Sequence, residues 1–394
     1  MVELELSVLS HDPETTNQLL PLLHAFEIQQ HIQVNLLVIP WSKGWTEIAK
    51  IGIYAQGPDV SEVGTTWVGS LASMQALRAF TPAEVRSLGG REAFFETVWQ
   101  TGILPGDESI WAIPWLGDAL VVYYWKDALE KAGVGDPQGA FADHPALVKT
   151  LGKLQENGYS YPLTLTTVNA TRNLHEASCW IWSAGGSLMS PDNKRVTFTD
   201  EAAFNGLRNF FSLLPFVSPE TLTVHSSSDL FMDNKAAVML AGPFHGTVGR
   251  TVFPELADRI GIAPILRITY AGGSSFVIWK HTQHERESFE LVRFLSSQPT
   301  HIPGSPHSLM LPTRRESLAM PSVQADIFQR TCLEALQTGQ SVPTVRLWGS
   351  IEEKLNQVIA NIWAELFACP CEDLDGCLHR HLDPLVDRLN LLNS

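Results

Sequence analysis

Twelve tryptophans are spread over the 394-residue sequence, a high number for this length. Five of them lie at the ends of predicted strands or in loops rather than on the apolar faces of predicted helices: Trp41, Trp67, Trp115, Trp182 and Trp348. An indole ring can stack on the apolar C–H face of a sugar, whose hydroxyl rim then requires carboxylate, amide or guanidinium partners. Any one of these tryptophans could instead belong to the core. The group as a whole therefore predicts a carbohydrate contact.

Polar residues close to these tryptophans could bind sugar hydroxyls. Asp118 lies three residues after Trp115, where its carboxylate either shapes a turn or accepts two hydrogen bonds from neighbouring hydroxyls. His175 could bind a hydroxyl or could simply lie on a helix surface. Arg346 precedes Trp348 in the predicted last loop before the C-terminal helix.

Two glycine-containing segments, 242–245 and 272–275, could bring backbone close to a ligand, although glycine also serves ordinary turns. From them we select Pro243, Phe244, Gly273 and Ser274 as candidate ligand contacts.

Motifs of catalysis are missing from the sequence. It contains no Gly-x-Ser-x-Gly elbow, no His-Glu-x-x-His helix and no P-loop. A glycosidase would need two facing carboxylates about 5 to 10 Å apart, and Asp59, Glu62 and Asp118 are the nominees. Nothing in the sequence distinguishes these three, so we predict no catalytic residue, no cofactor and no enzymatic activity.

Four of the five cysteines lie towards the C-terminus: Cys332, Cys369, Cys371 and Cys377. With His379 and His381 nearby, a zinc site is one interpretation. The paired Cys-x-x-Cys clamps of structural zinc sites are absent, so we predict no metal. A disulfide with spare thiols is the simpler expectation.

Strands and helices alternate along the N-terminal part of the chain. Residues 2–8 alternate apolar and acidic side chains, 32–39 are almost continuously apolar, as for a strand covered on both faces, and 58–64 form a short strand ending on glycine. A helix or turn plus helix is predicted over 41–54. This order indicates βαβ units and an α/β fold. Trp41 and Trp67 follow two of the strands, at the carboxyl ends where open α/β sheets bind ligands.

Amphipathic helices follow in the middle and at the end of the sequence. Thr199 is a predicted N-cap before the apolar face formed by Phe204, Leu207, Phe211 and Leu214. Two further apolar stripes are predicted to be core: Phe289, Val292 and Leu295, and Leu355, Val358, Ile359, Ile362 and Leu366.

Charge and the N-terminus limit the classes of partner. Acidic residues outnumber Lys and Arg by 42 to 27, for a net charge of -15, which disfavours nucleic-acid binding because that requires a basic face. No apolar run of about 18 residues is present to span a membrane. The chain starts in a predicted strand with no signal peptide, as in a cytoplasmic protein or the mature part of an exported one.

The order of these signals resembles family 1 of the extracellular solute-binding proteins, the maltose-binding-protein-like group. The most specific match is Trp111-Ala112-Ile113-Pro114-Trp115 through Tyr123-Tyr124-Trp125-Lys126-Asp127, which is similar to the family's G-I-P … L-Y-Y-N-K-D segment. Weaker matches in the same order are Phe26-Glu27 with Ile32-Gln33-Val34, Pro58-Asp59-Val60, Ala184-Gly185-Gly186, Ala236–Met239 with Gly242-Pro243-Phe244, Gly272–Ser274 and Leu311–Arg314. Phe244 stands where the family usually has Trp, and no lipid-acceptor cysteine is present.

This resemblance implies a two-lobed periplasmic-binding-protein fold, type II-like, with discontinuous lobes joined by a hinge. We expect an N-terminal lobe of residues 1–113 and 267–312 and a C-terminal lobe of residues 114–266 and 313–394, with chain crossings near Ile113, Leu266 and Pro312. A ligand would be captured in the interlobe cleft by hinge closure. By family position, Asp118 would bind the ligand, the segment with His175 and Trp182 would approach it, and Trp348 would occupy a stacking position.

The implied function is that of a monomeric receptor that delivers a carbohydrate to the transmembrane permease subunits of an ABC importer. The implied location is extracytoplasmic, either in the periplasm or anchored at the cell surface. Two alternatives stay open: a secreted carbohydrate-active hydrolase, and a binding protein for a polyamine, peptide or osmolyte.

Overall fold

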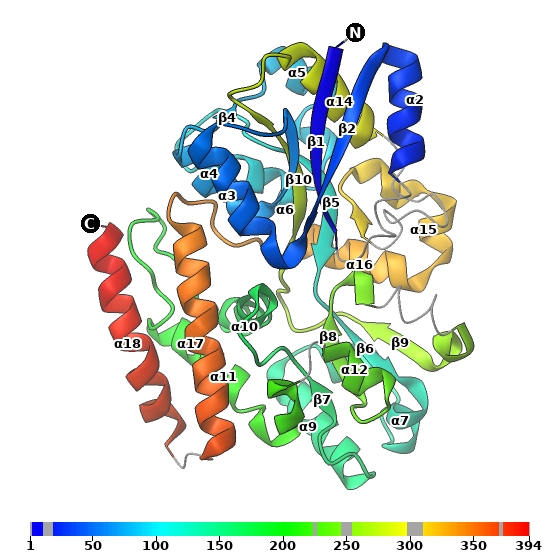
Figure 1. Ribbon diagram of the computed structural model, residues 1–394. Helices are drawn as coiled ribbons and strands as arrows, with labels where there is room; N and C mark the ends of the chain where they lie inside the picture. The colour runs from blue at the N-terminus through cyan, green and yellow to red at the C-terminus, as the bar shows by residue number, and fades with distance from the viewer. Residues whose placement is uncertain are drawn as a thin grey trace. The chain divides into compact units, whose positions relative to one another are not determined.

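The computed structural model describes residues 2–10, 19–223, 227–245, 254–297, 310–369 and 373–393. The chain forms two compact units (Figure 1). Unit 1 comprises residues 1–118, 271–326 and 341–349, and unit 2 comprises residues 119–270, 327–340 and 350–394. The chain therefore passes between units after Asp118, Tyr270, Asp326, Gln340 and Gly349, whereas we expected three crossings, near residues 113, 266 and 312. The assignment of the units as ligand-binding lobes stays a prediction.

Unit 1 is built on a mixed sheet. Its strand order is β11 (Leu311–Pro312), β5 (Ile113–Ala119), β10 (Ala271–Trp279), β3 (Val60–Gly64), β1 (Val2–Ser10) and β2 (Ile32–Pro40), and β4 (Leu77–Arg78) pairs with β10. β1 runs parallel to β2 and β3, whereas β10 runs antiparallel to β3. The predicted α/β arrangement of the N-terminal segments is confirmed.

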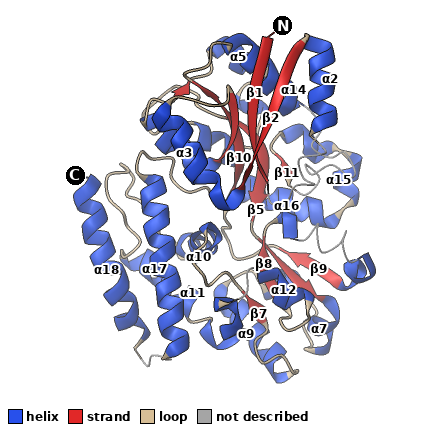
Figure 2. Cartoon of the chain, in the orientation of Figure 1, coloured by secondary structure: helices blue, strands red, loops and turns tan. Residues whose placement is uncertain are grey.

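Helices cover both faces of this sheet (Figure 2). One apolar cluster joins Leu6 of β1 and Phe276 of β10 to α2 (Leu20–Gln30) and α14 (Glu285–Ser297). The other joins Val63 of β3 and Val277 of β10 to α3 (Gly44–Tyr54) and α4 (Val68–Ser73). Successive side chains of a strand point to opposite faces, so one strand contributes to both clusters. Three short helices, α5 (Pro82–Ser87), α6 (Glu96–Trp99) and α15 (Pro321–Ala325), complete the unit.

Strand β2 corrects one expectation. Its almost continuous apolar sequence predicted a strand covered on both faces, but β2 lies at the edge of the sheet and pairs only with β1 in the strand order. Leu37 and Val38 are 42% and 39% exposed. The prediction was wrong because apolar content does not reveal strand order, which depends on non-local pairing.

Unit 2 has a smaller sheet with the order β7 (Leu163–Thr164), β8 (Val238–Ala241), β6 (Val121–Trp125) and β9 (Ile260–Ala263). β6 pairs antiparallel with β8 and β9, and every residue of β6 is buried. Its helices are α7 (Lys126–Lys131), α8 (Pro137–Ala140), α9 (His144–Glu156), α10 (Thr171–Ser183), α11 (Glu201–Phe211), α12 (Ser227–Met232), α16 (Ile327–Thr338), α17 (Trp348–Ala368) and α18 (Leu374–Asn393).

The predicted amphipathic helix near residue 200 is α11, and Phe204, Leu207 and Phe211 are buried as expected. Leu214, the fourth residue of the predicted stripe, lies beyond the end of α11 in a short 3-10 turn and is half-buried. The predicted N-cap was one residue early, since Asp200 occupies that position. The Asp200 carboxylate does not cap the helix, because it binds the guanidinium of Arg195 at 2.9 Å.

Cys179, Cys332, Cys369 and Cys377 all carry thiols, so the expected disulfide is not formed among them. Cys371 lies outside the described residues. No helix in the described part of the chain is both long and apolar enough to cross a membrane.

Candidate ligand-binding residues in the two units

Three tryptophans meet at the carboxyl ends of the parallel strands of unit 1. Trp41 directly follows β2 and Trp67 closely follows β3, and parallel strands end at the same edge of a sheet. The ring centroids of Trp41 and Trp67 are 5.5 Å apart, and those of Trp45 and Trp67 are 5.9 Å apart. Trp67 is only 8% exposed, whereas Trp41 and Trp45 are half-buried. Trp67 therefore supports two indoles that remain accessible. We call Trp41, Trp45 and Trp67 the tryptophan cluster.

Glycines make room for the central ring of this cluster. A Cβ atom on Gly44 would lie 2.8 Å from the Cη2 atom of Trp67, and one on Gly64 would lie 3.3 Å from its Cδ2 atom. Any larger residue would have to displace the ring. The sequence places these glycines at the start of α3 and the end of β3, so the local backbone and the ring position depend on each other.

The segment 344–349 packs beside α4 and α3. The Ser70 hydroxyl donates to the Arg346 carbonyl oxygen at 3.3 Å, and a Cβ on Gly69 would lie 2.7 Å from the Val345 carbonyl oxygen. The side chain of Arg346 is exposed. Trp348 is fully buried, and its indole N–H meets no acceptor among the described residues. Trp348 thus lies in the core of this structure, and the ligand contact expected of it stays a prediction.

A buried carboxyl lies in β3, which leads to the tryptophan cluster. Glu62 is 3% exposed, and its Oε2 atom accepts a hydrogen bond from the Leu9 N–H at 2.8 Å. Burial raises the pKa of Glu62 to about 7, because removal from water penalises the charged form, while the Ser274 hydroxyl and the Leu9 N–H act to lower it. From the sequence, Glu62 is only one of three carboxylates that nothing distinguishes from one another. A carboxylate within a fully buried strand is the signal that could have singled it out.

The other predicted residues of unit 1 are placed by the sheet itself. Trp115 is 5% exposed and stacks on Phe276 with a centroid distance of 4.3 Å, in the apolar cluster that faces α2 and α14. Gly273 has φ +131°, and a Cβ there would lie 2.0 Å from the Leu116 carbonyl oxygen, so close strand packing explains this glycine. Ser274 is buried opposite Gly64, and Asp118 is half-buried at the end of β5.

In unit 2, α10 carries the predicted residues His175 and Trp182. The His175 ring stacks on Tyr270 with a centroid distance of 3.7 Å, and its Nε2 atom lies 3.2 Å from the Glu352 Oε1 atom. Trp182 is only 3% exposed. Tyr270 and Glu352 could not be identified from the sequence, because their contacts with α10 join segments about 90 and 180 residues apart, separations that no local pattern encodes.

Glu176, next to His175, is fully buried and accepts hydrogen bonds from the Thr166 N–H and hydroxyl, both at 2.9 Å. Burial raises its pKa to about 8, and the charge of Arg172 acts to lower it. Pro243 and Phe244 follow strand β8. Pro243 is buried, and Phe244 is half-buried, with its ring edge-on to the His245 ring at a centroid distance of 5.5 Å. Phe244 is the more accessible of the two.

The structure thus brings Trp41 and Trp67 together, adds Trp45 to them, and pairs His175 with Tyr270. Trp45 could have been found from the sequence, since it lies four residues after Trp41, on the same side of a helical turn.

The sequence profile of the bacterial extracellular solute-binding proteins matches residues 12–301. The chain belongs to this family. A binding protein of Brucella abortus is 21% identical over 372 residues, covering 92% of this chain and 88% of that protein. A probable ABC transporter-binding protein of Deinococcus radiodurans is 23% identical over 265 residues, covering 63% of this chain and 60% of that protein.

Several solved structures have the same fold. The sugar-binding protein MalE of Xanthomonas citri has a TM-score of 0.83 at 21% identity, over 99% of this chain and 98% of that chain. Maltose-bound MalE3 of Thermotoga maritima has a TM-score of 0.80 at 19% identity, and each chain is fully covered. The predicted periplasmic-binding-protein fold is confirmed.

Proposed function

We propose that this solute-binding protein captures a carbohydrate for an ABC importer and releases it unchanged. The observation that carries the proposal is the tryptophan cluster at the carboxyl ends of β1, β2 and β3. This is the edge at which open α/β sheets bind ligands.

The cluster suits a sugar for a physical reason. Trp41 and Trp45 are accessible, large and held against the buried Trp67, so their rings lose little freedom when a ligand stacks on them. A pair of aromatic rings is worth about 0.5–1.5 kcal/mol beyond the area that is buried, and we expect a contribution of the same order from a sugar ring stacked on an indole. Two such rings would contribute a specific preference for the C–H face of a pyranose over a polar peptide or a small osmolyte.

The ligands of structural relatives support the same class. MalE of Xanthomonas citri is a sugar-binding protein, a solute-binding protein of Thermotoga lettingae was solved with α-D-tagatose, and a substrate-binding protein of Listeria monocytogenes was solved with cycloalternan. Those relatives are 21%, 16% and 17% identical to this chain. We infer a carbohydrate from them as a class and no particular sugar.

The transport role follows from the family. We propose an extracytoplasmic location, a monomeric state and delivery to the transmembrane permease subunits. The ligand must bind the transport-competent conformation more tightly than the other conformation, because equal affinity for both would not shift the equilibrium between them. The contributions of Asp118, His175, Trp182, Phe244 and Trp348 to the ligand site are part of this proposal.

The rival proposal, a hydrolase, would require a pair of available carboxylates. Asp59, one nominee, already has both oxygens engaged: Oδ2 accepts the Glu5 N–H at 2.9 Å and Oδ1 accepts the Thr282 hydroxyl at 2.5 Å. Glu62, the second nominee, is buried within β3 and accepts the Leu9 N–H at 2.8 Å. Only Asp118 of the three nominees is then available, and we therefore propose binding without turnover.

A thermal-shift screen of mono- and oligosaccharides, with polyamines and peptides alongside, tests the proposal. A ligand at a hundred times its Kd should add about 2.7 kcal/mol to the stability. Any sugar that shifts the melting temperature is then incubated with the protein and analysed for products. Recovery of intact sugar supports the receptor, cleavage overturns it, and shifts with amines alone overturn the carbohydrate assignment.

Two variants on one helix locate the site. Trp45→Ala should weaken the affinity for the sugar, measured by calorimetry, by about tenfold or more, equivalent to about 1.4 kcal/mol. Tyr54→Ala is the matched control, because Tyr54 is a 69% exposed aromatic at the opposite end of α3. Equal affinities of the two variants for the sugar would show that the tryptophan cluster is not part of the ligand site.

A further inference from the structure

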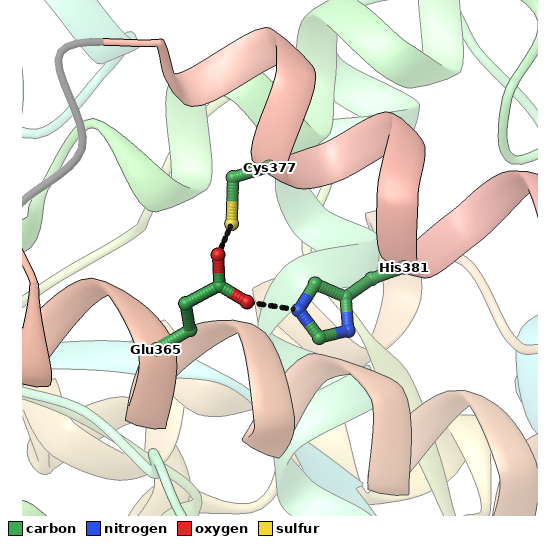
Figure 3. Close-up of side chains that lie close together, drawn as sticks. All are labelled: Glu365, Cys377 and His381. Atoms are coloured by element: carbon green, nitrogen blue, oxygen red, sulfur yellow. Dashed lines mark hydrogen bonds and ion pairs between the residues drawn. The ribbon is translucent and has the colours of Figure 1, made fainter.

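A mixed set of side chains that could bind a metal lies where the last two helices meet. Glu365 is in the last turn of α17, and Cys377 and His381 are in the first two turns of α18 (Figure 3). Residues four apart lie on one face of a helix, so Cys377 and His381 present a sulfur and a nitrogen side by side. Each of the three residues offers a ligand atom, and these atoms lie within 4.8 Å of one another.

Two hydrogen bonds hold the three ligand atoms of the set close together. The His381 Nε2 atom lies 2.7 Å from the Glu365 Oε2 atom, and the Cys377 Sγ atom lies 3.5 Å from the Glu365 Oε1 atom. Cys377 is fully buried, whereas the side chains of Glu365 and His381 are 34% and 23% exposed. Solvent therefore reaches the set from one side, and the sulfur closes the other.

We propose that Glu365, Cys377 and His381 form a zinc-binding site that fastens α18 to α17. One thiolate, one imidazole and one carboxylate are a ligand set that suits Zn²⁺, whereas Ca²⁺ and Mg²⁺ require oxygen ligands. The half-exposed side leaves the fourth position of a tetrahedral ion to a water molecule. Binding releases the proton of the Cys377 thiol to solvent, while neutral His381 keeps its single proton on Nδ1 so that Nε2 can bind the ion.

Surrounding groups fit this assignment. The Arg380 guanidinium binds the Glu365 Oε1 atom at 2.6 Å and leaves Oε2 facing His381, so it can orient the carboxylate from outside the coordination sphere. α18 is joined to α11 as well, through Arg208 and Asp375 at 2.6 and 2.8 Å and through the Phe204–His379 ring stack at 4.4 Å. An ion at the proposed site would add a connection of α18 to α17.

Cobalt absorption provides the test, because a thiolate bound to Co²⁺ gives a charge-transfer band that nitrogen and oxygen ligands do not. The full-length reduced protein is freed of metal with a chelator and titrated with Co²⁺ and then Zn²⁺. We expect the band to saturate at one equivalent and to disappear when Zn²⁺ displaces Co²⁺. Zn²⁺ should raise the melting temperature of the metal-free protein.

Variants assign the ligands. Cys377→Ala should abolish the band, and Glu365→Gln and His381→Gln should each weaken Co²⁺ binding by at least ~100-fold. Two matched controls should leave the band and the affinity for Co²⁺ unchanged. Cys369→Ser removes the exposed thiol at the end of α17, and His379→Gln removes a histidine that pairs with Asp383 and not with Glu365. Circular dichroism of each metal-free variant verifies folding, and the two glutamine variants keep the test valid if Cys377→Ala does not fold. No band in the unaltered protein, or a band lost with Cys369→Ser but kept with Cys377→Ala, would overturn the site.

Discussion

Replacing Glu62 with glutamine should make the protein more stable at pH 8 and leave it almost unchanged near pH 4.5. Burial raises the pKa of Glu62 from 4.5 to about 7, with the Leu9 N–H as one of the groups that oppose the shift. A carboxyl whose pKa is higher in the folded state favours folding in its protonated form. Its contribution is therefore fully present below pH 4.5 and is lost as the pH rises to about 7.

The size of the effect follows from the shift. A difference of 2.5 pKa units (7 minus 4.5) at 1.36 kcal/mol per unit corresponds to about 3 kcal/mol lost between pH 4.5 and 7. Glutamine keeps an oxygen that can accept the Leu9 N–H and carries no charge to desolvate. Glu62→Gln should recover most of those 3 kcal/mol above pH 7.

The assay is urea unfolding of the unaltered protein and Glu62→Gln at pH 5, 6, 7 and 8, with Glu92→Gln as the control because Glu92 is exposed. Glu176, which is also buried with a raised pKa, is present in every variant and cancels in the differences. A stability difference between Glu62→Gln and the unaltered protein that does not change from pH 5 to 8 would refute the reasoning.

Three further outcomes are expected. Gly44→Ala should destabilise unit 1 by about 1–2 kcal/mol and weaken sugar binding, because its Cβ would lie 2.8 Å from the Trp67 ring; urea unfolding and calorimetry measure both, and unchanged values would contradict the packing argument. Cys179 should resist a thiol reagent at pH 8 in the folded protein while the exposed Cys369 reacts, because burial raises the pKa of Cys179 to about 12. Mass spectrometry of the labelled peptides locates the label, and labelling of Cys179 as early as Cys369 would be evidence against its burial. Leu207→Ala should cost about 2–5 kcal/mol in thermal unfolding because Leu207 is fully buried on α11, and a loss below 1 kcal/mol would show that the site collapses around the smaller side chain.

Most helices and strands could be predicted from local patterns. Residues 58–64 do end a short strand on Gly64, and the apolar stripe through Phe289, Val292 and Leu295 does form the buried face of α14. Each pattern reflects the repeat of side-chain direction along one element, which neighbouring residues determine by themselves. The boundary error at Thr199 is of the same local kind, since two adjacent residues could both cap the helix.

The candidate site could be predicted only in part. Trp41 and Trp67 come together because each follows a parallel strand of the same sheet, an inference that strand order and direction permit. Trp115 and Trp348 are also tryptophans at similar predicted positions, yet both are buried. Their burial depends on Phe276 and on other segments distant in the sequence, so residue type could not separate them from Trp41.

The sequence by itself determined the α/β character, the family and the placement of tryptophans after strands, because these follow from local periodicity and from the order of short motifs. The tertiary structure decided that β2 is an edge strand, that the pKa of Glu62 is raised, and that Glu365 of one helix meets Cys377 and His381 of the next. The absence of paired Cys-x-x-Cys clamps argued against a metal, but ligands can come from two helix faces that only packing brings together. Edge position, desolvation and side-chain convergence all depend on contacts between distant parts of the chain.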